Sequence, residues 1–150
     1  MKKSFKIILL FVGITVLLLL VSHSLSNKKT LRIQTANGLI TYHVERALTP
    51  EEQAHGLMNR RKLAPKTGMI FLFSPIRKAY MWMKNTLIPL DMVFFDHTGL
   101  VVNIHYNAKP QDETIIPSIL PVAGVLEINA GEAKKFHIDY GSRLDLKNIR

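Results

Sequence analysis

The feature that most constrains this chain is a long apolar run near its N-terminus. Residues 7–21 are apolar apart from Gly13 and Thr15, and three lysines precede them. A positively charged start before about fifteen apolar residues is typical of a secretory signal, and residues 7–25 are also long enough to cross the hydrocarbon core of a bilayer. The lysines favour an N-terminus that stays inside the cell. We therefore expect residues 1–29 to be a signal peptide or a membrane anchor with a juxtamembrane linker.

The rest of the chain is then expected outside the cytoplasm, in the periplasm or at the cell surface, either anchored or secreted. We slightly favour a retained anchor, because alanine, the usual residue at a signal cleavage site, is missing after the apolar run. The membrane is accordingly the predicted partner of residues 7–25.

The same segment accounts for much of the basic charge. The whole chain has 20 Lys and Arg against 11 Asp and Glu, a formal net charge of +9. Residues 1–29 hold five lysines and no acidic residue, so residues 30–150 keep 15 basic and 11 acidic side chains. Nucleic acid is therefore not expected as a partner. The absence of cysteine excludes disulfides, thiolate metal sites and a cysteine nucleophile.

Residues 30–150 carry the pattern of one small, mainly β domain. Asn37-Gly38 is expected as a type I′ hairpin turn, and Thr49 with Glu52 predicts a short helix that begins with a capping box. Residues 109–121 hold three of the seven prolines and are expected to form a loop, and residues 130–135 one helical turn. Short apolar runs between turn signals predict strands at residues 31–35, 39–45, 68–73, 80–85, 91–96, 100–106, 122–129 and 141–146.

Many short strands with one or two brief helices favour a mainly β (α+β) domain, barrel-like or half-barrel, preceded by the N-terminal hydrophobic helix. A doubly wound sheet is disfavoured, because the long helices that would connect its strands are missing.

Basic residues are concentrated in one stretch, which has no acidic residue between Glu52 and Asp91. On one face they would attract anions such as phosphate, lipid headgroups or acidic glycans. A solvated basic surface that faces anionic lipid is the simpler alternative. The seven residues are Arg60, Arg61, Lys62, Lys66, Arg77, Lys78 and Lys84.

A Trp-Met-Lys-Asn-Thr string is the least ordinary part of this stretch. Strand alternation would place Trp82 and Lys84 on one side, where the indole would offer an apolar platform beside a cation. Met81, Met83 and Asn85 would face the other side. Asn85 precedes a proline-bearing bend, where its main role would be to hold the turn.

Glu127 occurs in an otherwise apolar strand predicted over residues 122–129. A buried carboxylate is costly unless it is paired, and Arg60 and Lys84 are the expected partners in a structural salt bridge. With Asp91, Glu127 could instead form a two-carboxylate acid–base pair.

No sequence motif for a cofactor, a nucleoside phosphate or a serine nucleophile is present, so no cofactor is predicted. The six histidines show no metal-binding spacing. Five of the six methionines lie between residues 58 and 92. Thioethers can bind Cu(I), which makes Met81 and Met83 an alternative copper pair, although methionines more often fill gaps in a core.

Four strings in this order resemble the domain of unknown function 192 family, small prokaryotic domains often found behind an export signal. The strings are residues 56–60 (Gly-Leu-Met-x-Arg), 68–73 (Gly-Met-Ile-Phe-x-Phe), 82–91 (Trp-Met-Lys-Asn-Thr-x-Ile-Pro-Leu-Asp) and 125–131 (Val-Leu-Glu-Ile-Asn-Ala-Gly). The resemblance covers residues 31–146 and departs from the family at His55, at Tyr80-Met81 and at Ser142. It implies a compact, mostly β fold and no established activity.

These patterns favour a non-enzymatic module of the cell envelope that binds a small anionic ligand or a partner protein. In the expected site, two cations would neutralise the ligand, the indole would pack against it and the carboxylates would orient the cations. Two alternatives stay open: a hydrolase or lyase that uses Asp91 and Glu127, and Cu(I) binding by Met81 and Met83. The expected site residues are Arg60, Trp82, Lys84, Asn85, Asp91 and Glu127.

Overall fold

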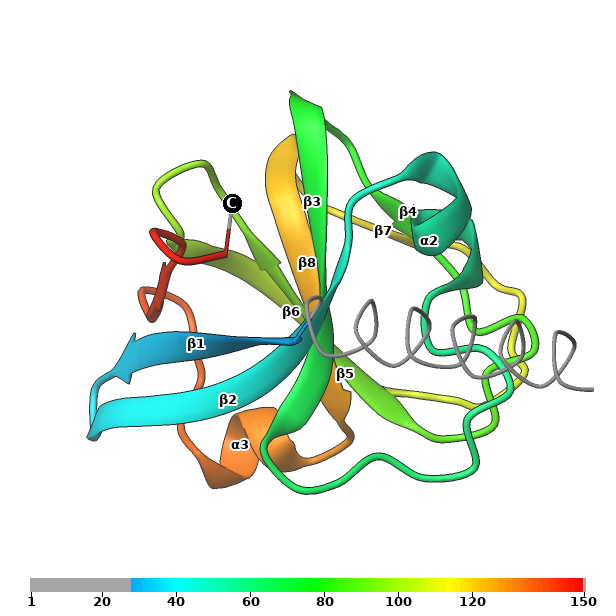
Figure 1. The fold of residues 1–150 in the computed structure, drawn as a ribbon, viewed down its shortest axis with the longest axis horizontal. Coiled ribbons are helices and arrows are strands. Elements are labelled where there is room, and N and C mark those ends of the chain that lie inside the picture. The colour runs from blue at the N-terminus through cyan, green and yellow to red at the C-terminus, as the bar shows by residue number, and fades with distance from the viewer. Residues whose placement is uncertain (1–27, 150) are drawn as a thin grey trace, which may run out of the picture.

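In the computed structural model, which describes residues 28–149, most strands pair into one twisted sheet (Figure 1). The described elements are β1 (Lys28–Thr35), β2 (Gly38–Ala47), α2 (Pro50–His55), β3 (Thr67–Arg77), β4 (Tyr80–Met81), β5 (Leu90–Phe95), β6 (Val101–Ala108), β7 (Ile116–Pro117), β8 (Val122–Asn129), α3 (Glu132–Lys135) and β9 (Arg143–Asp145). Seven strands form the sheet in the order β6-β5-β8-β3-β2-β1-β9, and a separate two-stranded sheet pairs β4 with β7.

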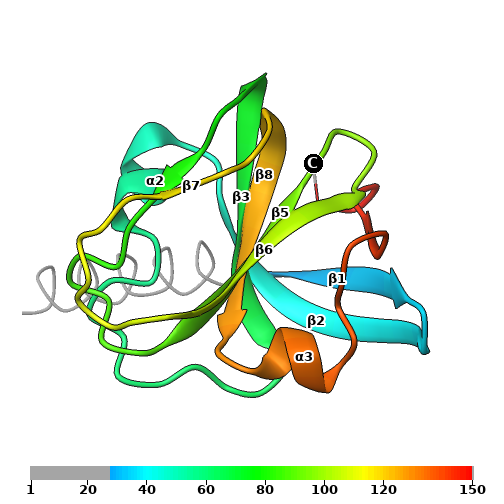
Figure 2. The same ribbon diagram turned by 180° about the vertical axis from the view of Figure 1, so that it is seen from behind.

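The expectation of one mainly β domain with short helices is confirmed, but the sheet is not closed into a barrel. Its edges are β6 and β9, and the β6 edge, with β5 beside it, is seen in the view from behind (Figure 2). One isolated bridge, between Leu100 and Arg143, joins the two ends of the sheet. A barrel would need a continued ladder there, so the sheet remains open.

The hairpin of β1 and β2 turns one residue earlier than predicted. Thr35 pairs with Gly38, so Ala36 and Asn37 form the turn and not Asn37-Gly38. The Thr35 hydroxyl accepts the N–H of Asn37 at 3.2 Å and donates to the carbonyl of Gly38 at 3.0 Å. This side-chain turn fixes the position of the reversal, and Gly38 follows it with a positive φ of 116°.

The start of α2 is as predicted. The Thr49 hydroxyl accepts the N–H of Glu52 at 3.2 Å, and the Glu52 carboxylate accepts the N–H of Thr49 at 3.0 Å. This reciprocal capping box satisfies donors that a helix start leaves open. The helix ends at His55, three residues before the predicted end near Met58, because Gly56 leaves the helical conformation with φ 50° and ψ −133°.

The sheet separates two apolar cores, since β5 and β8 are buried along most of their length and β3 is largely buried up to Phe73. Strands buried on both faces read as continuous apolar runs, which is why these three were recognisable. The first core includes Leu31, Tyr42, Val93, Leu126 and Ile128, and the second core includes Leu57, Phe71, Met83, Phe94 and Val125.

The predicted strand over residues 80–85 contains only β4. Residues 84 and 85 form a turn, and Asn85 has a left-handed φ of 54°, which a strand cannot continue. The loop predicted over residues 109–121 contains β7, which pairs Pro117 with Tyr80. The second core therefore has a short two-stranded wall beside it.

The predicted leader, with its hydrophobic helix over residues 7–25, lies outside the described residues. It therefore stays a prediction. Lys28 and Lys29, expected in the linker, are the first residues of β1. Within residues 28–149 no helix combines the length and apolar character that crossing a bilayer requires.

Candidate functional site

Glu127 lies near the middle of β8, with its side chain on the face of the second core. Its Cα partners are Met69 on β3 and Met92 on β5, and both of these methionines belong to the second core. Only 4% of Glu127 is exposed. The sequence thus places an ionisable group among apolar side chains, where a charge is poorly solvated.

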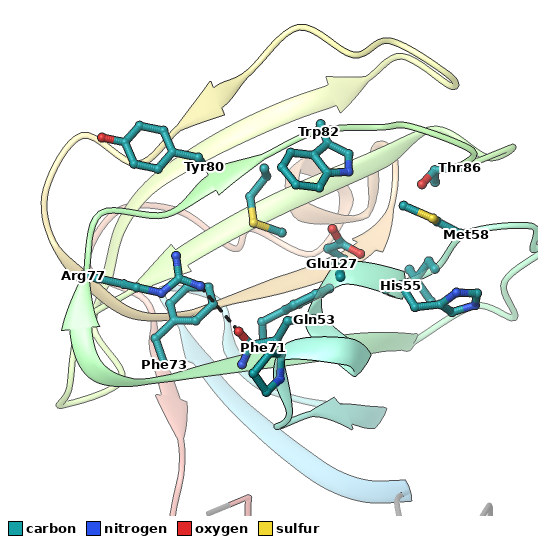
Figure 3. A pocket seen from close by; sticks show the side chains of 15 residues that line it. Gln53, His55, Met58, Phe71, Phe73, Arg77, Tyr80, Trp82, Thr86 and Glu127 are labelled. Atoms are coloured by element: carbon teal, nitrogen blue, oxygen red, sulfur yellow. Dashed lines mark hydrogen bonds between the residues drawn. The ribbon is translucent and has the colours of Figure 1, made fainter.

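A cavity of about 360 Å³ opens beside this carboxyl, a size within the lower range of small-molecule sites. We call it the Glu127 pocket. Figure 3 shows the Glu127 carboxyl directed into it, with Trp82 on one side and Phe71 on the other. The lining residues are Pro50, Gln53, Ala54, His55, Gly56, Leu57, Met58, Phe71, Phe73, Arg77, Tyr80, Met81, Trp82, Thr86 and Glu127.

The end of α2 closes one side of the pocket through Gly56. A Cβ at this position would lie 3.1 Å from Cζ of Phe71 and 3.9 Å from Oε2 of Glu127. The positive φ and this close approach both favour glycine. The backbone after α2 can therefore pass directly over the aromatic ring and the carboxyl.

Arg77, at the end of β3, forms part of the wall. Its guanidinium lies 4.1 Å from the centre of the Phe73 ring and donates to Oε1 of Gln53 at 3.4 Å (Figure 3). Gln53 in turn donates to the carbonyl of Leu72 at 2.9 Å. The cation is therefore held against an aromatic ring by a side chain of α2.

The opposite wall comes from β4, which pairs with β7, and from Trp82 and Thr86 after β4. The backbone of Ala79 donates to Oγ of Ser118 at 3.0 Å and accepts the N–H of Ser118 at 2.9 Å. The N–H of Met83 donates to the carbonyl of Asp112 at 2.9 Å. These bonds fix the segment directly after β4 that carries Trp82, a residue that remains 42% exposed at the mouth.

Burial raises the pKa of Glu127 from 4.5 to about 8. Among residues 28–149, no hydrogen bond or ion pair to its carboxyl oxygens is found. Desolvation favours the neutral form of an acid, so the carboxyl holds a proton at neutral pH. A perturbed acid in a cleft is a candidate functional group on physical grounds.

Of the residues predicted to form the site, the structure brings Trp82 and Glu127 together. Met81, proposed for the copper alternative, also lines this pocket. Arg60, Lys84, Asn85 and Asp91 do not line it.

Arg60 has a different partner from the one expected. Its guanidinium forms a two-pronged ion pair with Glu45 of β2, with Nη1 to Oε1 at 2.7 Å. The Arg60 hydrogen bonds hold the pKa of Glu45 below its usual value. Arg60 thus ties the segment between α2 and β3 to the sheet.

Lys84 and Asn85 are exposed residues of the turn that follows Trp82. The carbonyl of Asn85 accepts the N–H of Asn59 at 2.8 Å, a backbone bond that links this turn to the segment after α2. The basic stretch is spread out in the structure, because Lys66 directly precedes β3 and Arg77 is the last residue of that strand.

Asp91 and Glu127 face opposite sides of the sheet. Asp91 is paired with Ile128, and its buried carboxylate accepts the N–H groups of Asn107 at 2.9 Å and Ala133 at 3.0 Å. Both carboxylate oxygens therefore accept hydrogen bonds from the backbone on the side of the first core. The geometry does not provide the shared cleft that a two-carboxylate acid–base pair needs.

The structure also does not direct the Met81 and Met83 side chains to one accessible point where both could bind Cu(I). Met83 is fully buried in the second core, whereas Met81 lines the pocket. Residues 28–149 contain no group of three or more His, Asp and Glu side chains placed to hold a metal ion.

Several pocket residues were not recognised as site residues from the sequence. They read as ordinary helix or core positions: Gln53, His55, Met58, Phe71, Phe73 and Thr86. One signal could have found Met58, Phe71, Phe73 and Thr86, because all four strings of the family resemblance contribute to the pocket. Met58, Phe71, Trp82 and Glu127 represent one string each.

A family model matches residues 31–146, that of domain of unknown function 192, described as an uncharacterized ACR. The chain belongs to this family. The match confirms the resemblance stated above, over the same residues. No curated protein matches the chain.

Two solved structures are similar to this DUF192 domain. One is a crystal structure from Sinorhizobium meliloti 1021 of a candidate transcription regulator, with 46% sequence identity and a TM-score of 0.77, covering 79% of this chain and 92% of the other. The second, from Novosphingobium aromaticivorans, is a protein of unknown function with 41% identity and a TM-score of 0.77, covering 79% of this chain and 84% of the other.

Proposed function

We propose that this chain is a non-enzymatic binding module of the cell envelope, and that the Glu127 pocket holds a small ligand. One observation carries the proposal: a buried carboxyl, without a partner among the described residues, faces an open cavity. A ligand that donates a hydrogen bond to Glu127 would give this carboxyl a partner, and such a bond contributes about 0.5–1.5 kcal/mol net.

The shape and lining of the pocket support a ligand with an apolar body. Aromatic and thioether side chains form its walls, and such surfaces with a few polar groups are typical of small-molecule sites. The cations expected to neutralise an anionic ligand, Arg60 and Lys84, lie elsewhere. The structure therefore favours a hydrogen-bond donor over the anion expected from the sequence.

Binding without catalysis fits the groups that surround the carboxyl. The other titratable lining residues are His55, Arg77 and Tyr80, and no hydrogen bond from them to Glu127 is found in the described part of the chain. A nucleophile activated by an adjacent base, the usual signature of covalent catalysis, is not assembled in this pocket.

Ligand-observed NMR with a library of small polar and apolar fragments tests the proposal. We expect fragments that bind the wild-type protein and lose affinity in both Trp82→Ala and Glu127→Gln. The matched controls are Arg60→Ala and Lys84→Ala, which the structure predicts to bind like the wild type. A screen with no fragment sensitive to Trp82 and Glu127 would contradict the proposed function.

The envelope location rests on residues 7–25 and is tested separately. We expect the native protein in the membrane fraction or the exported fraction. The intact mass of the mature protein distinguishes a retained anchor from a cleaved signal. Recovery of the full-length chain, free in the cytoplasm, would contradict this part.

A further inference from the structure

We infer that the Glu127 pocket selects ligands that carry an ammonium group, bound with the ammonium on the Glu127 carboxylate and with an apolar body against the aromatic walls. This inference rests on the proposed function and names the chemical class of its ligand.

The lining residues supply the two groups that recognise organic cations. A carboxylate accepts N–H donors and provides the opposite charge. Trp82, Tyr80 and Phe71 are among the lining residues, and the face of an aromatic ring attracts cations through its quadrupole. One wall already shows this preference, because the Arg77 guanidinium lies over Phe73.

The charges that line the pocket are less suited to an anion than to a cation. Arg77 is the only Lys or Arg among the described lining residues, and it is held by Phe73 and Gln53. An ammonium beside Glu127 gains an oppositely charged partner when the carboxyl ionises, whereas the ionised carboxylate would repel an anion. The charge arrangement therefore separates the two ligand classes.

Proton release should accompany binding. Burial raises the pKa of Glu127 to about 8 in the empty pocket, and an ammonium stabilises the ionised form, so the bound carboxyl gives up its proton. The other charged or titratable groups that line the pocket are His55 from α2, Arg77 from β3 and Tyr80 from β4. On β5 the residue opposite Glu127 is Met92.

Three probes of one shape test the inference: benzylammonium, benzyl alcohol and benzoate. The chain has one tryptophan, so the single indole N–H signal in a ¹⁵N-correlated NMR spectrum reports Trp82 at the mouth of the pocket. We expect benzylammonium to bind the wild-type protein at least tenfold more tightly than either other probe. Glu127→Gln, of nearly the same shape, should remove that preference.

The pH dependence gives a second readout. Between pH 6 and 8 the affinity for benzylammonium should rise, by up to about tenfold per unit, because deprotonation of Glu127 is linked to binding. His55→Gln should keep this slope, whereas Glu127→Gln should lose it. A neutral carboxyl that binds anions would instead give benzoate an affinity that rises as the pH falls.

Failure of the inference can be told apart from failure of the proposed function. If benzoate or benzyl alcohol shifts the Trp82 signal as strongly as benzylammonium, the inferred preference for ammonium ligands is wrong. The proposed function of the pocket as a small-molecule site is then still supported. If benzylammonium produces no shift, the inference is overturned, and the fragment screen decides whether the pocket binds anything else.

Discussion

Met92 is the cross-strand partner of Glu127, so a carboxyl and a fully buried thioether lie side by side on one face of the sheet. The next pair along, Asp91 with Ile128, faces the other way. Two acids that are close in the ladder thus have unrelated environments. Asp91 is satisfied by two backbone N–H groups, whereas Glu127 faces an open cavity.

Glu127→Gln should stabilise the protein above neutral pH. The pKa of this acid is raised from 4.5 to about 8 in the folded state, so the unfolded chain loses its proton first as the pH rises. Wild-type stability should therefore fall between about pH 5 and 8, by a few kcal/mol in total. The variant lacks this loss, which urea unfolding at pH 5 and pH 8.5 would measure.

Glu113→Gln is the matched control for that experiment, because Glu113 is exposed and undergoes the same chemical change. Its unfolding free energy should follow the wild type at both pH values. A Glu127→Gln protein with an unchanged pH dependence would show that the carboxyl is not desolvated as described.

Arg60→Ala should weaken folding and leave ligand binding intact. The Arg60 and Glu45 side chains are 34% and 27% exposed, so solvent screens the pair and the expected loss is about 1 kcal/mol or less. Arg60 lowers the pKa of Glu45, so this contribution is present above about pH 4.5 and fades as Glu45 is protonated at lower pH. A double-mutant cycle with Glu45→Ala measures the coupling, and a loss of ligand affinity in Arg60→Ala would restore its predicted binding role.

Asp91→Asn should destabilise the domain without affecting the pocket. An amide keeps one oxygen acceptor and turns a donor group toward a backbone N–H, either that of Asn107 or that of Ala133. The expected loss is about 1–3 kcal/mol. Chemical denaturation measures it, and an unchanged fragment-binding profile of the folded variant would confirm that Asp91 serves the other side of the sheet.

Gly56→Ala should reduce both stability and ligand affinity. The backbone conformation at Gly56 costs a residue with a side chain about 1–3 kcal/mol, and the added methyl would press on Phe71 beside Glu127. Gly131→Ala is the control, because Gly131 also has a positive φ but open space around the position of a Cβ. The control should lose stability alone, and equal affinity losses in the two variants would contradict a specific role for Gly56.

Local signals in the sequence were sufficient for much of the fold. The capping box at Thr49 and the apolar run of β8 each depend on neighbouring residues, and both were predicted correctly. The turn after Thr35 was misplaced because a hydroxyl bonded to the backbone outweighed the Asn-Gly preference. The strand expected after Tyr80 failed because of the left-handed residue Asn85.

The site was harder to predict because it depends on register between distant strands. β5 and β8 are buried on both faces, so alternation does not reveal which side Asp91 or Glu127 faces. The partner of Arg60 is likewise distant in sequence and depends on where β2 passes the segment after α2. Trp82 and Glu127 were selected from their chemistry, and their meeting in one pocket follows from the tertiary structure.

The division of the molecule by β3, β5 and β8 has a practical consequence for engineering. The first core, on the side of Leu31, can be left unchanged while the residues that line the Glu127 pocket are varied. The two sides of the sheet meet mainly through the backbone of these three strands. Variant libraries confined to that lining should yield many folded members, which makes this small domain a convenient starting point for new receptors.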